Sequence, residues 1–335
     1  MPETSARPSI EHLPVTAEAV DEAAAELRVH LPPSPLQYSR AFTAKAGCHV
    51  LLKIEAVQPT RSFKVRGALN KLIRMSPDLR AAGVITASAG NHGQGVAYAA
   101  QTFGVPATVY VPDNANALKV QAIRRLGSRV VHFGRSYNEA YLEALRAQEA
   151  SGATFVHAFD DPDVVAGQGT MAVELLRQLD EQAAGADTVL VPVGGGGLIA
   201  GIALYLKTRR PGVQVIGVEP GGADALSRSL EAGRLVTLDR VATMADGLAA
   251  SAPGSLTLRI ARTHVDAMIR VAESEMLRAI RLFFEWEHLL AEPAGAAALA
   301  ALLYHYTPKP SERVVVILSG ANVTDDVMVR ALRAR

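Results

Sequence analysis

The chain has 335 residues, of which 49% are hydrophobic and 20% are charged, and its formal net charge is +1. This length allows one large or two modest hydrophobic cores, and the near-zero charge, without runs of like charge, argues against a nucleic acid partner. Cys48 is the single cysteine, which excludes an intramolecular disulfide and a multi-cysteine metal cluster.

The N-terminal segment, Met1 to His12, lacks the apolar core and small-residue cleavage site of a signal peptide. We expect it to be a loose tail. The most apolar stretch, Pro293 to Tyr304, is bounded by Glu292 and His305 and is too short to cross a bilayer. We therefore expect a cytoplasmic protein with no membrane partner.

The first half of the chain alternates short apolar strands with amphipathic helices. A helix over 16–30, with Thr16 as its N-cap and a proline cluster at its end, precedes a strand over 49–55. The spacing then predicts strands over 84–88, 107–112, 129–133 and 154–158, alternating with helices over 93–103, 116–126 and 137–149. This order is typical of βαβ units and a parallel sheet.

The alternation resumes in the second half of the chain. The pattern predicts a helix over 164–179, a strand over 188–193, a helix over 198–208, a strand over 214–219, a helical region over 274–306 interrupted at Pro293, and a strand over 313–318. So many strands exceed a comfortable single sheet. We predict an α/β protein with two open, mostly parallel, twisted sheets flanked by helices, in which a small domain, 58–155, is inserted in a large domain, 1–57 and 156–335.

Four consecutive glycines follow a predicted strand. The loop residues are Gly194, Gly195, Gly196, Gly197 and Leu198. Backbone amides without side chains can converge on an anion at a helix N-terminus, so the loop predicts a phosphate site. The loop also fits a dinucleotide fingerprint through Gly195, Gly197 and Ala200, with Glu219 as the ribose-binding acid, which leaves a nicotinamide-dependent dehydrogenase open.

A second candidate site lies in the loop between a predicted strand and helix, at Ser88, Ala89, Gly90, Asn91 and His92. Ser88, the Gly90 amide and Asn91 could bind a carboxylate, and Asn91 could instead bond the phenolic oxygen of a cofactor ring. A histidine at the start of a helix is more typical of packing than of a general base, and we interpret the His92 side chain in that way.

A lysine lies in a third unusual segment, Arg61 to Gly67. An isolated lysine is usually a solvated surface charge. Lys64, however, follows Phe63 and precedes Gly67, a setting in which desolvation can lower the pKa of the amine. The neutral amine would then be a nucleophile.

Five motifs occur in one order along the chain: Ser62-Phe63-Lys64 with Arg66-Gly67-Ala68, Ser88 to His92, Gly194 to Gly197, Glu292-Pro293, and Leu318 to Asn322. In order and spacing, from about Pro35 to Val323, the chain resembles the pyridoxal-phosphate (PLP) dependent enzymes of fold type II, specifically the threonine/serine dehydratase and serine racemase branch. The resemblance implies a tryptophan synthase β-like fold and a homodimer.

The resemblance implies an ammonia-lyase that converts L-threonine or L-serine to a 2-oxo acid and ammonia by β-elimination. It implies that Lys64 holds PLP as a Schiff base and then removes the Cα proton. The residues that the resemblance assigns to the cofactor are Phe63, Lys64, Asn91, Gly194, Gly195, Gly196, Gly197, Leu198 and Ser319, with Asn91 at the 3-hydroxyl and Ser319 at the pyridine nitrogen. The loop from Ser88 to His92 would bind the substrate, and the small domain would close over it.

The resemblance also bears on reaction outcome and on metal. Serine racemases have a second serine that faces the lysine across the cofactor, and Ala89 lies at that position, which favours dehydration. The nearest alternative is a related lyase or racemase for serine or threo-3-hydroxyaspartate. The family's cation ligands correspond to Glu219, Ala223 and Ala225; because Ala225 is no ligand and the Asp224 side chain would point elsewhere, we predict no tight metal site.

Biosynthetic threonine dehydratases carry an additional C-terminal regulatory domain. The chain ends soon after its last motif, so we expect neither that domain nor allosteric control by isoleucine.

Overall fold

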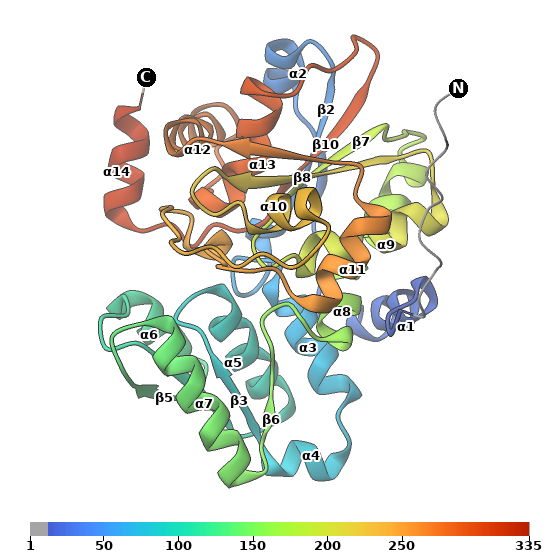
Figure 1. The fold of residues 1–335 in the computed structure, drawn as a ribbon. Helices are drawn as coiled ribbons and strands as arrows, with labels where there is room; N and C mark the ends of the chain where they lie inside the picture. Colours follow the sequence, from blue (N-terminus) through green and yellow to red (C-terminus); the bar gives the residue numbers. More distant parts are fainter. Residues whose placement is uncertain (1–12, 335) are drawn as a thin grey trace.

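The computed structural model describes residues 13–334 and has two α/β lobes (Figure 1). The expected tail, Met1 to His12, lies outside the described residues. The larger lobe contains a six-stranded sheet in the order β1-β2-β10-β7-β8-β9, in which only β1 is antiparallel to its neighbour. Its strands are β1 (Leu36–Tyr38), β2 (His49–Ile54), β7 (Thr188–Pro192), β8 (Gln214–Pro220), β9 (Ala267–Val271) and β10 (Arg313–Leu318).

Helices cover both faces of the large sheet. One face packs against α1 (Ala17–Leu27), α8 (Pro162–Glu181), α9 (Gly197–Arg209) and α11 (Ser255–His264). The other packs against α2 (Arg40–Ala46), α12 (Glu273–Glu287), α13 (Pro293–Tyr304) and α14 (Asp325–Arg333). Val189 and Val191 of β7 enter the first core and Leu190 enters the second. A strand covered on both faces needs a continuous apolar run, which is why 188–193 is recognisable in the sequence.

The smaller lobe contains a parallel four-stranded sheet in the order β5-β4-β3-β6. Its strands are β3 (Val84–Ala87), β4 (Ala107–Val111), β5 (Arg129–His132) and β6 (Thr154–Phe155), and its helices are α4 (Pro77–Ala82), α5 (Asn91–Phe103), α6 (Ala117–Arg125) and α7 (Tyr137–Ser151). Helix α3 (Lys64–Arg74) packs against both α5 and α8 and so lies where the lobes meet (Figure 1). The prediction of two mostly parallel sheets flanked by helices is confirmed.

The predicted elements are present, with boundary differences. Thr16 caps α1 as expected, because its side chain accepts a hydrogen bond from the Ala19 amide. The largest difference is the break in the helical region, which spans 288–292 rather than lying at Pro293, the first residue of α13. Strand β6 ends at Phe155 rather than at Ala158. The Val156 carbonyl accepts a hydrogen bond from the Thr86 hydroxyl and lies beside the His92 ring. Side chains, rather than a neighbouring strand, thus contact this carbonyl.

Several elements were not predicted from the sequence. They are β1, β9, α2, α3, α4, α14, the helix α10 (Ala225–Ala232) and the short 3₁₀ turns η1 (Glu55–Val57) and η2 (Asp246–Leu248), together with α11. Among residues 13–334, no helix is both long enough and apolar enough to span a bilayer.

Candidate active site

The candidate residues come from loops that follow strands in both lobes. Gly194 follows β7, Ser319 follows β10, and Ser88 follows β3, so all three lie beyond the carboxyl ends of parallel strands. Such ends are where ligands bind in open α/β sheets. Lys64 begins α3 at the junction of the lobes.

Lys64 has a partly buried side chain with an altered pKa. Its Nζ donates a 2.8 Å hydrogen bond to the carbonyl of Ala158 and lies 5.3 Å from the centre of the Phe63 ring. Burial lowers the pKa of Lys64 from 10.5 to about 8, since desolvation penalises the ammonium form. The amine is therefore close to the state in which it can attack an aldehyde.

The glycine loop is held so tightly that side chains are excluded. A Cβ on Gly195 would lie 2.4 Å from the Phe159 ring, and a Cβ on Gly197 would lie 2.8 Å from Phe159 Cβ. Gly196 has a φ of 92°, which favours glycine. The Gly195 carbonyl accepts the Thr257 hydroxyl at 2.7 Å. The Gly195 carbonyl therefore has a partner within the protein. The first amides of α9 have no acceptor within the helix and could donate to an anion, so the loop has the chemistry of a phosphate site.

Asn91 is fixed from the opposite lobe. Its Nδ2 donates to Glu292 Oε1 at 2.5 Å, and its Oδ1 accepts from Asn322 Nδ2 at 2.7 Å. Burial, with a contribution from Asp246, raises the pKa of Glu292 to about 7. The side chain of Asn91 is thus orientated by two groups of the large lobe.

Ser319 lies beside the lysine segment. Its carbonyl accepts a 3.1 Å hydrogen bond from the Phe63 amide, and Ser62 forms an isolated bridge with Gly320. Among residues 13–334, the one hydrogen-bond partner of the Ser319 hydroxyl is the carbonyl of Ala294, at a long 3.4 Å. The hydroxyl therefore retains capacity for a further partner.

The Ser88 loop presents backbone and hydroxyl groups. The Ser88 Oγ accepts from the Gly90 amide at 3.2 Å, and Ala89 is partly buried between them. The His92 ring instead lies 2.9 Å from the Val156 carbonyl. Burial and the nearby Lys64 charge lower the pKa of His92 to about 3, so the buried ring is neutral. This geometry supports packing, rather than proton transfer, for the His92 ring.

Glu219 caps a helix. Its carboxylate accepts from the amides of Leu226 and Ser227, both at 2.9 Å, and from the Ser227 hydroxyl at 2.6 Å. Burial raises the pKa of Glu219 to about 7. These bonds occupy the acid that the dinucleotide interpretation assigned to a ribose.

The Asp224 side chain is paired with two arginines. Its two oxygens accept from the Nε atoms of Arg228 and Arg270 at 2.8 and 2.9 Å. Within 13–334, no group of three or more His, Cys, Asp or Glu side chains is placed to hold a metal ion.

Sequence reasoning missed Phe159 and Thr257, which shape the glycine loop. Phe159 follows the strand predicted over 154–158, so the rule that sites lie after parallel strands pointed toward it. Thr257 lies in α11, which no local pattern had marked, and its contact with Gly195 joins residues 62 positions apart.

Comparison with known proteins agrees with this geometry. The family model described as pyridoxal-phosphate dependent enzyme matches residues 27–320. The L-threonine ammonia-lyase of Thermotoga maritima is 41% identical over 95% of this chain and 78% of its own length.

Two solved structures have the same fold. A threonine deaminase from T.th. is 39% identical, with a TM-score of 0.88 over 92% of this chain and 99% of that one. A maize serine racemase is 33% identical, with a TM-score of 0.89 over 95% and 97%. The buried Lys64 and the tightly packed glycine loop fit a family match that spans most of the sequence. This chain belongs to the family of pyridoxal-phosphate dependent enzymes.

Proposed function

We propose that the protein is an ammonia-lyase that converts L-threonine, L-serine or both to the corresponding 2-oxo acid and ammonia. The observation that carries the proposal is the buried Lys64 amine, with a pKa of about 8, in a chain 41% identical to an L-threonine ammonia-lyase. The nicotinamide alternative is disfavoured because the family is PLP-dependent and Glu219 is occupied by α10.

The described residues fit PLP. The cradle from Gly194 to Gly197, with the Leu198 amide, would hold the phosphate, and the Lys64 amine would hold the aldehyde carbon. Phe63 would lie along the ring, Asn91 would bond the 3-hydroxyl and Ser319 the pyridine nitrogen. When bound, the cofactor withdraws electron density from the Cα of the substrate.

The protein's own groups would handle the protons and the substrate carboxylate. The Lys64 amine, once released, would remove the Cα proton as a general base. The loop at the start of α5 would bind the substrate carboxylate, since the helix dipole there favours an anion. Its residues are Ser88, Ala89, Gly90, Asn91 and the backbone of His92. The Ser319 side chain has a hydroxyl, which cannot keep the pyridine nitrogen protonated as a carboxylate would. A neutral ring withdraws electrons more weakly, so early loss of the substrate's β-hydroxyl is favoured.

A racemase is the second candidate, because the maize serine racemase shares the fold. Racemisation needs an acid on the face of Cα opposite to Lys64. Ala89 has no proton to give, so dehydration should exceed racemisation.

Two further features belong to this proposal. We infer that the protein is a cytoplasmic homodimer. Its mass measured by light scattering should be about twice the chain mass of 35.4 kDa. Exposed apolar side chains at and after the end of α12, Phe284, Trp286 and Leu290, are 40–50% exposed and support an association face. We also propose that residues 58–155 move as a small domain over the substrate.

The test combines chemistry with a substrate panel. Borohydride reduction of the purified protein, followed by peptide mapping, should place the cofactor adduct on Lys64. Release of 2-oxo acid should be measured with L-threonine, L-serine and threo-3-hydroxyaspartate, and D-serine formation with L-serine. Absence of turnover with both L-threonine and L-serine would contradict the proposal, and faster D-serine formation than 2-oxo acid release would favour the racemase.

A further inference from the structure

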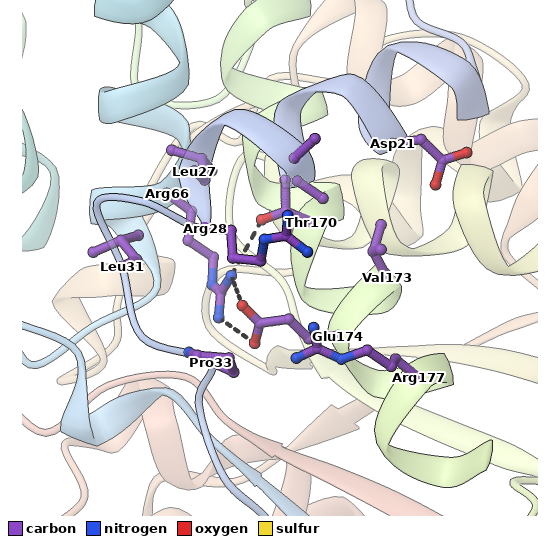
Figure 2. A pocket seen from close by; sticks show the side chains of 12 residues that line it. Asp21, Leu27, Arg28, Leu31, Pro33, Arg66, Thr170, Val173, Glu174 and Arg177 are labelled. Atoms are coloured by element: carbon purple, nitrogen blue, oxygen red, sulfur yellow. Dashed lines mark hydrogen bonds and ion pairs between the residues drawn. The ribbon is translucent and has the colours of Figure 1, made fainter. Parts of the chain in front are cut away.

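A cavity of about 260 Å³ lies between α1, the turn after it and α8 (Figure 2). None of the candidate active-site residues lines it. Its apolar wall includes Leu27, Leu31 and Val173, and its charged groups include Arg28, Arg177 and Glu174. Figure 2 shows Arg66 paired with the Glu174 carboxylate, with the side chains of Arg28 and Arg177 lining the same cavity.

The buried charges at the base of the cavity balance one another. Arg66, 1% exposed, forms ion pairs of 2.8 Å with Glu55 and with Glu174. Lys53 lies 2.9 Å from the same Glu174 carboxylate. Burial would raise the pKa of Glu174, but Arg66 and Lys53 lower it to about 2. Two cations and two anions therefore form a neutral, hydrogen-bonded group that needs no external charge.

The charges nearer the opening do not balance. Asp21 is occupied by Tyr205 and Arg209, each at 2.6 Å. Arg177 has one long contact, 3.6 Å, with the exposed Glu181, and no carboxylate within residues 13–334 forms an ion pair with Arg28. The opening of the cavity thus has an excess of positive charge, which favours an anion.

We propose that this cavity binds a small aliphatic carboxylate. Arg28 and Arg177 would hold the carboxylate, since a guanidinium can donate two parallel hydrogen bonds to it. Leu27, Leu31 and Val173 would cover the aliphatic part, which phosphate lacks. Because water takes up about 30 Å³ per molecule, the cavity has room for roughly eight non-hydrogen atoms.

Calorimetric titration of the holoenzyme with butanoate tests the site. We expect a Kd on the order of 1 mM, typical of a ligand with about six non-hydrogen atoms. Arg28→Gln and Arg177→Gln should each weaken binding about tenfold, through loss of a charge-assisted hydrogen bond. Ala24→Leu, which fills the cavity from α1, should abolish binding. Arg262→Gln, an exposed arginine on α11, should leave the affinity unchanged.

Two further ligands serve as comparisons: butylamine has the opposite charge to butanoate, and inorganic phosphate lacks its aliphatic part. Butylamine and inorganic phosphate should bind at least about tenfold more weakly than butanoate. Equal butanoate affinity in all four variants would place the ligand elsewhere, including the active site, and would overturn the proposal. Tighter binding of phosphate or butylamine would overturn the carboxylate class. The titration measures heat and needs no turnover, so its result is independent of the proposed lyase activity.

Discussion

Lys64 has a pKa of about 8 because burial penalises its ammonium form. In cofactor-free protein the fraction of neutral amine should rise through about pH 8, rather than near the ordinary value of 10.5. The rate of PLP uptake, followed by absorbance, should therefore increase with pH, with its midpoint near pH 8 and a plateau above about pH 9. Lys64→Ala is the control and should form no covalent adduct at any pH. A midpoint near that of an exposed lysine would show that the side chain is hydrated.

Glu292 is a buried acid whose pKa is raised from 4.5 to about 7, chiefly by desolvation. Between these values the folded protein binds more protons than the unfolded chain, so this group lowers stability as pH rises. At about pH 8 Glu292→Gln should be more stable than the parent by up to about 3 kcal/mol, since one pKa unit corresponds to about 1.4 kcal/mol.

Urea denaturation of the cofactor-free proteins at about pH 5 and about pH 8 measures this difference. The stability gain of Glu292→Gln should shrink at the lower pH. Glu219 has a similarly raised pKa but is present in both proteins, so its contribution cancels in the comparison. A gain that does not depend on pH would contradict the assignment.

The glycine loop at the start of α9, which we propose holds the PLP phosphate, is shaped by close backbone packing. A Cβ at Gly197 would lie 2.9 Å from Phe159 Cα, a backbone atom that cannot rotate away. Gly197→Ala should therefore displace the loop and weaken PLP binding at least about tenfold, a loss of about 1.4 kcal/mol. Fluorescence titration of cofactor-free protein gives the affinity. Gly212→Ala is a matched control because its Cβ meets no atom within 4 Å, and it should bind PLP as the parent does.

The elements that the sequence predicted are those with local signals. Strand β7 has an apolar run and α1 has a Thr16 cap, and both are recognisable from neighbouring residues alone. Helix α10 has no local side-chain cap; Glu219, at the end of β8, supplies it across seven positions. Helix α3 also lacks local signals, because Phe63 makes no side-chain cap and Gly67 lowers the helix propensity of the segment. The sequence pattern therefore did not predict it.

The same distinction explains the candidate sites. Gly194 to Gly197 and Lys64 have distinctive local sequences, so the sequence pointed to them. The cavity beside α1 depends on Arg66 and Glu174, which are 108 positions apart and resemble surface charges in sequence. Only the folded chain brings them together, because buried ion pairs form between distant segments and follow no periodic pattern.

At the scale of the whole molecule, Lys119 of α6 forms an ion pair with Asp246 of η2 and so joins the small lobe to the large lobe. The Asp246 side chain is 58% exposed and that of Lys119 is 15% exposed, so solvent at Asp246 weakens the pair, which should contribute little to stability. Lys119→Glu should therefore change the unfolding free energy by under about 1 kcal/mol. It should raise the KM for L-threonine severalfold, because repulsion between the carboxylates would oppose the proposed closure of residues 58–155 over the substrate.

Reversal of the pair separates this effect from a local defect. The double variant Lys119→Glu with Asp246→Lys restores the attraction and should return KM close to that of the parent, whereas Asp246→Lys alone should resemble Lys119→Glu. Steady-state kinetics at low and high salt provide a second measure, since salt screens exposed charges and should reduce the difference between the single variants and the parent. If the double variant is no better than either single variant, the ion pair does not couple the proposed lobe closure to substrate binding.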